Sequence, residues 1–135
     1  MNEQEFKDRT KQLALRVIRL VEALPRKSTA EVIGRQLLRS ATSVGANYRA
    51  ACRGKSAADV INKLSIVEEE ADETLYWMEL LVETRLMDET RLASLIAETN
   101  EIVAMIVTSI RTLRGRQVVT RPSGIQNPKS KIQNL

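Results

Sequence analysis

The chain has 135 residues, a formal net charge of +4, one cysteine, four aromatic residues and no histidine. This length suits a single domain with its own core, and the lone Cys52 excludes an internal disulfide. The missing histidine removes the most common general base near neutral pH and the most common transition-metal ligand. With so few aromatic residues, the core must be built from Val, Ile, Leu and Ala.

The first predicted helix covers residues 3–24, where apolar residues recur at helical spacing and a proline follows. A second helix is predicted from Ser28, which forms a capping-box pattern with Glu31. It is predicted to end at Gly54, which has the position of a left-handed terminating residue. Gly45 lies inside this helix at a cost of about 1 kcal/mol relative to Ala. It therefore predicts a close helix approach or a slight kink.

The third predicted helix covers residues 56–84, begins at a Ser56–Asp59 cap, and has two apolar faces at about 100° per residue. The first face holds Val60, Leu64, Val67, Ala71, Leu75, Met78 and Val82, and the second holds Ile66, Trp77 and Leu80. One face serves the core of the chain, and the other requires a different partner because exposing it forgoes roughly 1.5–3 kcal/mol per large side chain. This pattern predicts self-association through Ile66, Trp77 and Leu80, with Glu73 beside them.

The fourth predicted helix runs from Asp88 to Gly115 and carries a broad apolar arc. Loops this short between long helices place neighbours antiparallel. The sequence therefore predicts an all-α fold, an antiparallel up-down-up-down four-helix bundle over residues 1–115. Residues 116–135 are polar, contain Pro and Gly, and predict a disordered basic C-terminal tail.

Charge is distributed unevenly along the chain. Residues 1–110 hold 15 lysines and arginines against 17 acids, whereas residues 111–135 hold six basic residues and no acid. Within the first of these segments, residues 1–55 sum to +7 and residues 56–110 to −9. Such complementary halves attract each other within one chain or between subunits, and the sequence alone allows both.

Two short patterns suggest chemistry that their context does not favour. Gly54-Lys55-Ser56 is similar to the end of a phosphate-binding loop, but the glycine required five positions earlier is Arg49 and no strand precedes it. A helix end followed by a serine cap is the favoured interpretation. Cys52 has neither a second thiol nor a histidine to activate it, so it is interpreted as a small core residue rather than a nucleophile.

A cluster of acids in the third predicted helix is the one candidate for metal chemistry. Glu69 with Asp72, and Glu98 with Glu101 in the fourth helix, have the spacing by which all-helical nucleotide pyrophosphohydrolases hold Mg²⁺. This gives an alternative function, a Mg²⁺-dependent nucleotide hydrolase. A solvated or salt-bridged face is the favoured interpretation, and neither catalytic residues nor a metal or cofactor are predicted.

The basic residues of the second predicted helix form a stripe. Arg35, Arg39, Arg49 and Arg53 fall within about 80° of one another, opposite the apolar face. Either they contact phosphates along a nucleic-acid backbone, or they pair with the acidic third helix of a neighbouring subunit, which is favoured for Arg39 and Arg49. Beyond them, a low-specificity RNA or DNA contact or a solubilising role remains open for the C-terminal arginines Arg114, Arg116 and Arg121.

A series of short motifs spans residues 36–81: Gln36 to Ala41, Ser43 to Asn47, Arg53 to Ser56, and the long segment from Leu64 to Leu81. In this order they resemble the four-helix bundle proteins of the 23S rRNA intervening-sequence family. There, a second-helix pattern with Gln, Arg, Ser and Asn precedes a Gly- and Arg-containing turn and a Glu-rich third helix. The chain departs from the family at residues 48–52, where many members have Ile-Ala-Glu-Gly, and in its basic tail.

This resemblance implies an antiparallel four-helix bundle that assembles as a ring, with homopentamers typical, and no established enzymatic activity. Similar proteins of diversity-generating retroelements are thought to bind nucleic acid and a reverse transcriptase through basic surfaces. The expected function is therefore a non-enzymatic homo-oligomeric scaffold that contacts RNA or DNA or a nucleoprotein partner, with no small-molecule substrate. No secretion signal or membrane-spanning run opens the chain, so a cytoplasmic setting without a membrane partner is expected.

Overall fold

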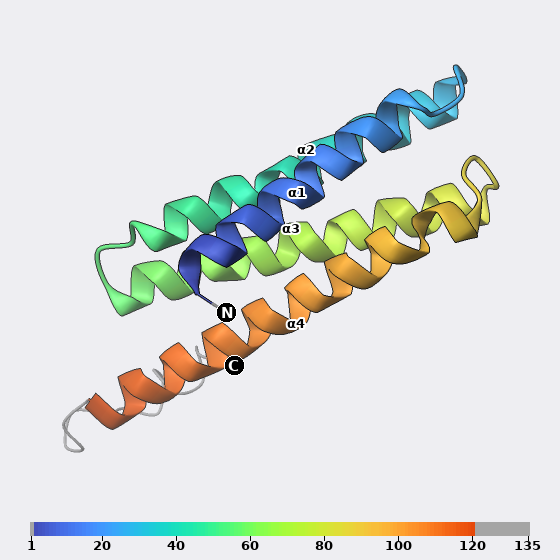
Figure 1. Cartoon of the computed structure of the whole chain (residues 1–135). Helices are drawn as coiled ribbons and strands as arrows, with labels where there is room; N and C mark the ends of the chain where they lie inside the picture. The colour runs from blue at the N-terminus through green and yellow to red at the C-terminus, as the bar shows by residue number, and fades with distance from the viewer. Residues whose placement is uncertain (1, 121–135) are drawn as a thin grey trace.

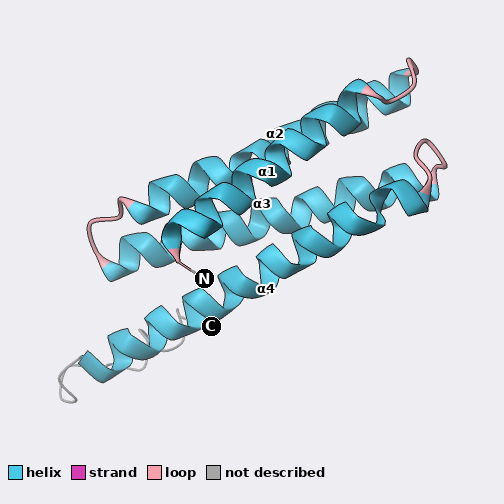
Figure 2. Ribbon diagram, in the orientation of Figure 1, coloured by secondary structure: helices cyan, strands magenta, loops and turns pink. Residues whose placement is uncertain are grey.

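The computed structural model describes residues 2–120, with side chains described as far as residue 117. Four helices follow one another: α1 (Glu3–Glu22), α2 (Ser28–Cys52), α3 (Ala57–Glu83) and α4 (Glu89–Thr120). They form an elongated bundle in which each short loop reverses the chain (Figure 1), and residues 2–120 contain no strand (Figure 2). The predicted all-α, up-down-up-down four-helix bundle is confirmed. The predicted disordered tail lies, from residue 121 onward, outside the described residues.

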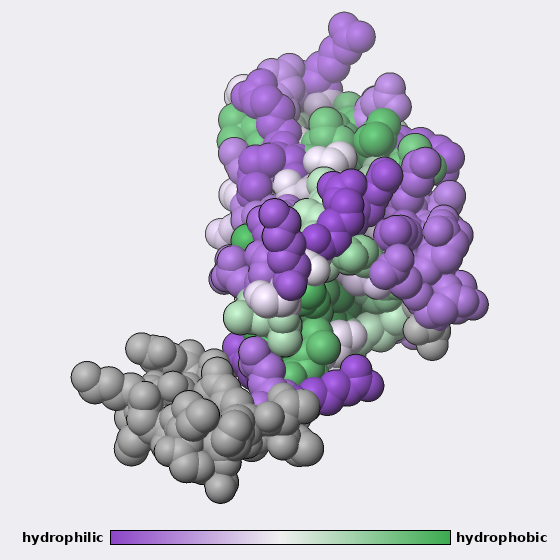
Figure 3. All heavy atoms as spheres, turned by 90° about the vertical axis from the view of Figure 1, so that its left-hand side faces the viewer, coloured by the Kyte–Doolittle hydropathy of each residue, from purple (hydrophilic) through white to green (hydrophobic). Residues whose placement is uncertain are grey.

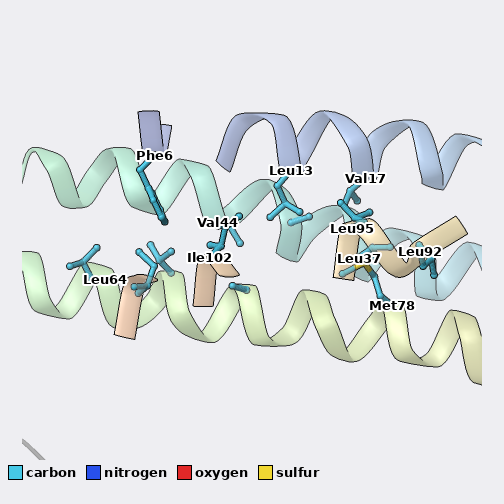
Figure 4. Packing of buried hydrophobic residues seen from close by; sticks show 14 of the residues in the cluster. Phe6, Leu13, Val17, Leu37, Val44, Leu64, Met78, Leu92, Leu95 and Ile102 are labelled. Atoms are coloured by element: carbon cyan, nitrogen blue, oxygen red, sulfur yellow. The ribbon is translucent and has the colours of Figure 1, made fainter. Parts of the chain in front are cut away.

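Buried side chains in each helix recur mostly at alternating steps of three and four residues. This is the a and d spacing of a heptad, whose period of 3.5 residues keeps one stripe facing the neighbouring helices along the whole bundle. Figure 4 shows such side chains from all four helices meeting in the interior. The main buried positions are Phe6, Thr10, Leu13 and Val17 in α1, Ile33, Leu37, Ser40 and Val44 in α2, Leu64, Val67, Ala71, Thr74, Met78 and Leu81 in α3, and Leu92, Leu95, Thr99, Ile102 and Ile106 in α4.

The core face of α3 differs from the predicted one. Val60, Leu75 and Val82 are half-buried, whereas Ile61, Thr74 and Leu81 are buried. Thr74 was missed because only apolar side chains were assigned to the core. Its Oγ1 lies 2.8 Å from the carbonyl oxygen of Glu70 and 3.0 Å from Oγ of Ser40 on α2. A buried hydroxyl with such partners avoids the cost of an unsatisfied polar group.

The loop between α2 and α3 shows one correct and one wrong prediction. Ser56 caps α3, because its Oγ accepts a hydrogen bond of 3.1 Å from the backbone N–H of Asp59. Gly54 does not adopt a left-handed conformation, and no described glycine has a positive φ. Glycine is instead required for space, since a Cβ at this position would collide with the side chain of Val60.

Two predictions for α2 also have different outcomes. The capping box at Ser28 is wrong: Ser28 is the first helical residue, and the cap position is Lys27, which makes no capping hydrogen bond. The close approach predicted at Gly45 is confirmed, because a Cβ there would lie 3.3 Å from Oγ1 of Thr10 on α1. Gly45 therefore lets the first two helices pack closely together.

The fourth helix is longer than predicted. α4 continues through Gly115 to Thr120, and a Cβ at Gly115 would meet no atom within 4 Å. The predicted helix end at this glycine is wrong, since a glycine weakens a helix without stopping it. Residues 89–117 are long and apolar enough to span a membrane by length and composition. In the bundle, however, Leu92, Ile102 and Ile106 of this helix are fully buried, as in the core helix of a bundle.

Candidate nucleic-acid and subunit interfaces

The carboxylates proposed as Mg²⁺ ligands do not form a site. Glu98 and Glu101 of α4 both bind Arg9 of α1, whereas Glu69 and Asp72 are exposed on α3. Residues 2–120 contain no group of three or more acidic or cysteine side chains placed to hold a metal ion. The alternative Mg²⁺ ligand set is therefore not assembled, because the four side chains are not brought together and Glu98 and Glu101 are ion-paired to a guanidinium.

Arg9 joins the first and last helices. Its Nε donates to Oε2 of Glu98 at 2.8 Å, and its Nη2 contacts Oε1 of Glu98 and Oε2 of Glu101, each at 2.6 Å. Arg9 and Glu98 are only 26% and 21% exposed. The hydrogen bond from Arg9 holds the pKa of the Glu98 carboxyl below its ordinary value, although burial opposes this shift. This pair was not predicted, and no local sequence pattern links residues so far apart.

Arg39 is paired within its own chain. On α2 it lies 3.1 Å from Oε2 of Glu70 and also bonds to Glu73, and both glutamates belong to α3 of the same molecule. The expectation that Arg39 pairs with the third helix of a neighbouring subunit is therefore corrected. Glu73, predicted as a subunit contact, also accepts a 3.2 Å hydrogen bond from Nε1 of Trp77. The hydrogen bond from Arg39 lowers the pKa of Glu73 below its ordinary value.

The other arginines of the α2 stripe remain available. Arg35, Arg49 and Arg53 are exposed, and none of them forms an ion pair with another residue of the range 2–120. No acid occurs between Glu31 and Asp59 in the sequence, so α2 has no internal counter-charge beyond its first turn. The structure therefore divides the stripe into one neutralised member, Arg39, and three with open guanidinium groups.

The basic residues of α4 lie at the same end of the bundle as Arg53, because α2 and α4 run in the same direction. A cavity of about 430 Å³ at this end is lined by Cys52 of α2 and Arg116 of α4, among others. Arg116 is exposed, and Arg114 is half-buried with its Nε lacking a hydrogen-bond partner among the described residues. The predicted Arg121 lies outside the described residues. Figure 3 looks onto this end and shows hydrophobic surface between hydrophilic flanks.

The predicted second apolar face of α3 is partly used inside the chain. Trp77 and Leu80 are half-buried and pack against the core, and Ile66 is half-buried. The ring of Trp77 meets that of Tyr76 edge-on, with centroids 5.0 Å apart. Tyr76 and Val32 of α2 are each 52% exposed. These two exposed side chains were not predicted as contacts, although their apolar character at solvent-facing positions is visible in the sequence.

The loop after α2 has the role predicted for it, whereas Cys52, interpreted as a core residue, is only half-buried and lies outside the core. The thiol is free and half-buried, and burial raises its pKa, which disfavours the nucleophilic thiolate. Gly54, Lys55 and Ser56 connect two helices, and Ser56 is a helix cap. A phosphate-binding loop would follow a strand, and none is present among residues 2–120.

Comparison with known proteins agrees with this geometry. The family model described as 23S rRNA-intervening sequence protein matches residues 2–108. A solved structure of a protein of unknown function from the S23 ribosomal protein family of Bacteroides thetaiotaomicron is 37% identical, with a TM-score of 0.77. The match covers 82% of this chain and 99% of that one. No curated protein matches the chain.

Proposed function

This chain belongs to the 23S rRNA-intervening sequence protein family, and we propose that it is a non-catalytic, self-associating scaffold that binds the phosphate backbone of nucleic acid. Neither the family description nor that of the solved relative names an enzymatic activity. Within residues 2–120, Arg35, Arg49 and Arg53 are exposed without ion-pair partners. The glutamates that lie between helices are instead ion-paired to Arg9 and Arg39. Such a surface suits a binding role.

The observation that carries the nucleic-acid proposal is the absence of acids from the C-terminal parts of α2 and of the described α4, which end on the same side of the bundle. Between Glu31 and Asp59 the chain has five basic residues and no acid, and after Glu101 the described part of α4 adds three arginines and no acid. Because α2 and α4 are parallel, Arg49, Arg53 and Lys55 lie at the same end of the bundle as the three arginines of α4. Exposed guanidinium groups bind phosphate oxygens through paired hydrogen bonds, and releasing counterions from the nucleic acid favours the complex.

A salt titration tests this proposal. Binding of the full chain to a labelled RNA is measured at several salt concentrations, and the slope of log K against log salt gives the number of phosphate contacts. We expect a steep slope that becomes shallower when the chain is truncated after Thr120, which removes Arg121 and two lysines. A slope near zero in the full chain would contradict the proposal.

Self-association is supported by the apolar side chains on the α2–α3 face. Val32 and Tyr76 are exposed, and Trp77 lies beside Tyr76. Aromatic residues are enriched at the centres of protein interfaces, and closed rings are formed when one patch binds a different patch on the next copy. The assembly we propose is a ring of five chains of 15.2 kDa each.

Light scattering on surface variants tests the assembly. Trp77→Glu removes a side chain that also packs in its own chain, so Val32→Lys and Tyr76→Glu are cleaner probes. We expect smaller particles with unchanged helicity. Thr42→Lys, an exposed position of α2 outside this apolar group, serves as the control. If Trp77→Glu, Val32→Lys and Tyr76→Glu all assemble like the native chain, the proposed contact is wrong.

A further inference from the structure

The outer surface between α1 and α2 contains a groove lined by basic side chains from both helices. The groove has a volume of about 450 Å³. Lys7 and Lys11 line it from α1, and Arg49 lines it from α2. Arg53, the C-cap residue of α2, follows four residues later. Only Arg49 and Arg53 of these were visible as a pattern in the sequence, because the lysines belong to another helix.

Small residues make the groove possible. Its lining includes Ala14 of α1 and Gly45 and Ala46 of α2. Gly45 lies against Thr10, which brings the helices close together and leaves no bulky side chain between the basic rows. Residues four apart on a helix are separated by about 6 Å, and packed helix axes lie about 8–10 Å apart. The cations therefore stand on both sides of a narrow channel.

The charges of the groove are only partly compensated. Lys7 pairs with Glu3 at 3.3 Å, and Asp8, the one acidic residue of the lining, accepts a 3.0 Å hydrogen bond from Gln4. Lys11 and Arg49 form no ion pair with any residue of the described range. An anion lying in the channel would thus meet at least two free cations, Lys11 on the α1 side and Arg49 on the α2 side.

The aromatic residues lie away from this groove or are already in use. Phe6 is buried and packs on Tyr48 with ring centroids 4.5 Å apart, while Tyr76 and Trp77 lie on α3 beside Glu73. Proteins that hold single strands stack the bases on aromatic side chains. This surface offers charge without a stacking platform, so it favours a nucleic acid whose bases are already paired.

We propose that the α1–α2 groove binds one phosphate strand of a nucleic-acid duplex, without reading its sequence. This inference rests on the proposed nucleic-acid binding and specifies its site and its substrate class. Lys11 and Arg49 contact phosphates from opposite sides, Lys7 lies at the level of Arg49, and Arg53 extends the row of cations beyond it. Arg39 takes no part, because Glu70 and Glu73 already neutralise it.

The test compares charge-matched variants of the full chain on a short RNA duplex and the matching DNA duplex. Lys11→Gln combined with Arg49→Gln should lower the salt slope by about 0.9 for each phosphate that is no longer neutralised, or about 2 in total. Arg26→Gln combined with Arg91→Gln removes the same charge from exposed positions at the opposite end and should leave the slope unchanged. Equal reductions in both variants would overturn the groove as the site.

Two further variants change the acidic residue of the groove lining and the space within the groove. Asp8→Asn removes the acid of the lining and should raise duplex affinity several-fold. Ala46→Leu adds a bulky side chain to the groove lining without changing charge and should lower the affinity while helicity is retained. If Ala46→Leu binds as the native chain does, the phosphate strand does not lie in the groove.

The nature of the ligand is tested with an unstructured oligouridine of the same length as the duplex. We expect the duplex to bind at least as tightly, and tenfold tighter binding of the single strand would overturn the assignment to duplexes. RNA and DNA duplexes should bind alike, since phosphates are the shared chemistry. Absence of binding to every nucleic acid would instead overturn the proposed function itself.

Discussion

The contact between α2 and α3 (the α2–α3 seam) and the contact between α1 and α4 (the α1–α4 seam) are each crossed by an arginine that binds two glutamates. The two arginines differ in how much they contribute to holding their helices together. Arg39 is 46% exposed and lies over a long seam, the most extensive helix contact in the bundle. Arg9 is 26% exposed and crosses the α1–α4 seam, the least extensive helix contact in the bundle. Apolar packing therefore holds α2 to α3, whereas an ion pair has a leading part in holding α1 to α4.

The largest effect is expected from the apolar packing of the α2–α3 seam. Leu37 is fully buried on α2, at the level of Met78 on α3 (Figure 4), as the contact between Ser40 and Thr74 requires for antiparallel helices. Leu37→Ala should lower the free energy of unfolding by about 3 kcal/mol. Leu38→Ala, the same change at a half-buried neighbour, should cost about half as much. Urea unfolding followed by circular dichroism measures both, and equal decreases would contradict the assigned core face.

A smaller loss of stability is expected from replacing either arginine, and its size should differ between Arg9 and Arg39. Arg9→Gln should destabilise the bundle by about 2 kcal/mol, because it leaves Glu98 partly buried without its partner. Arg39→Gln should cost less than about 1 kcal/mol, as expected for an exposed pair. The same unfolding measurement applies. If Arg39→Gln were the more damaging change, the difference drawn between the two seams would be reversed.

The pH dependence of stability gives the smallest effect. The pKa of Glu98 lies below its ordinary value of 4.5 in the folded chain, so its pair with Arg9 contributes stability above pH 4.5 that is lost as pH falls through the folded value. The difference in unfolding free energy between the native chain and Arg9→Gln should therefore shrink under acid conditions. A difference that stays constant down to about pH 2 would show that packing of the Arg9 side chain, and not its charge, holds the seam.

Sequence reasoning predicted the four helices because each depends on neighbouring residues. The Ser56–Asp59 cap, the close approach at Gly45 and the apolar stripe of α1 all use signals within one or two turns. Local signals were misleading at Ser28 and Gly115, where a residue typical of helix ends lies inside the helix. A cap or a glycine shifts a helix boundary by about 1 kcal/mol, which the packing of a long helix overrides.

The candidate sites were predicted less completely, because they combine residues from different helices. The basic stripe of α2 was visible from its spacing, but its division into a neutralised Arg39 and a free Arg49 depends on which acids α3 presents. Lys11 joins Arg49 only because α1 packs across Gly45. The set of Glu69, Asp72, Glu98 and Glu101 had suitable spacing on each helix, yet α4 turns its pair toward Arg9.

Hydrophobic periodicity and short loops were sufficient to specify four antiparallel helices, since both are properties of residues close together along the chain. The partner of each charge was decided by folding, because Arg9 and Glu98 are 89 positions apart and meet only when the last helix packs against the first. At such separations, helix rotation and register determine the contact, and both are set by the packing of the whole core.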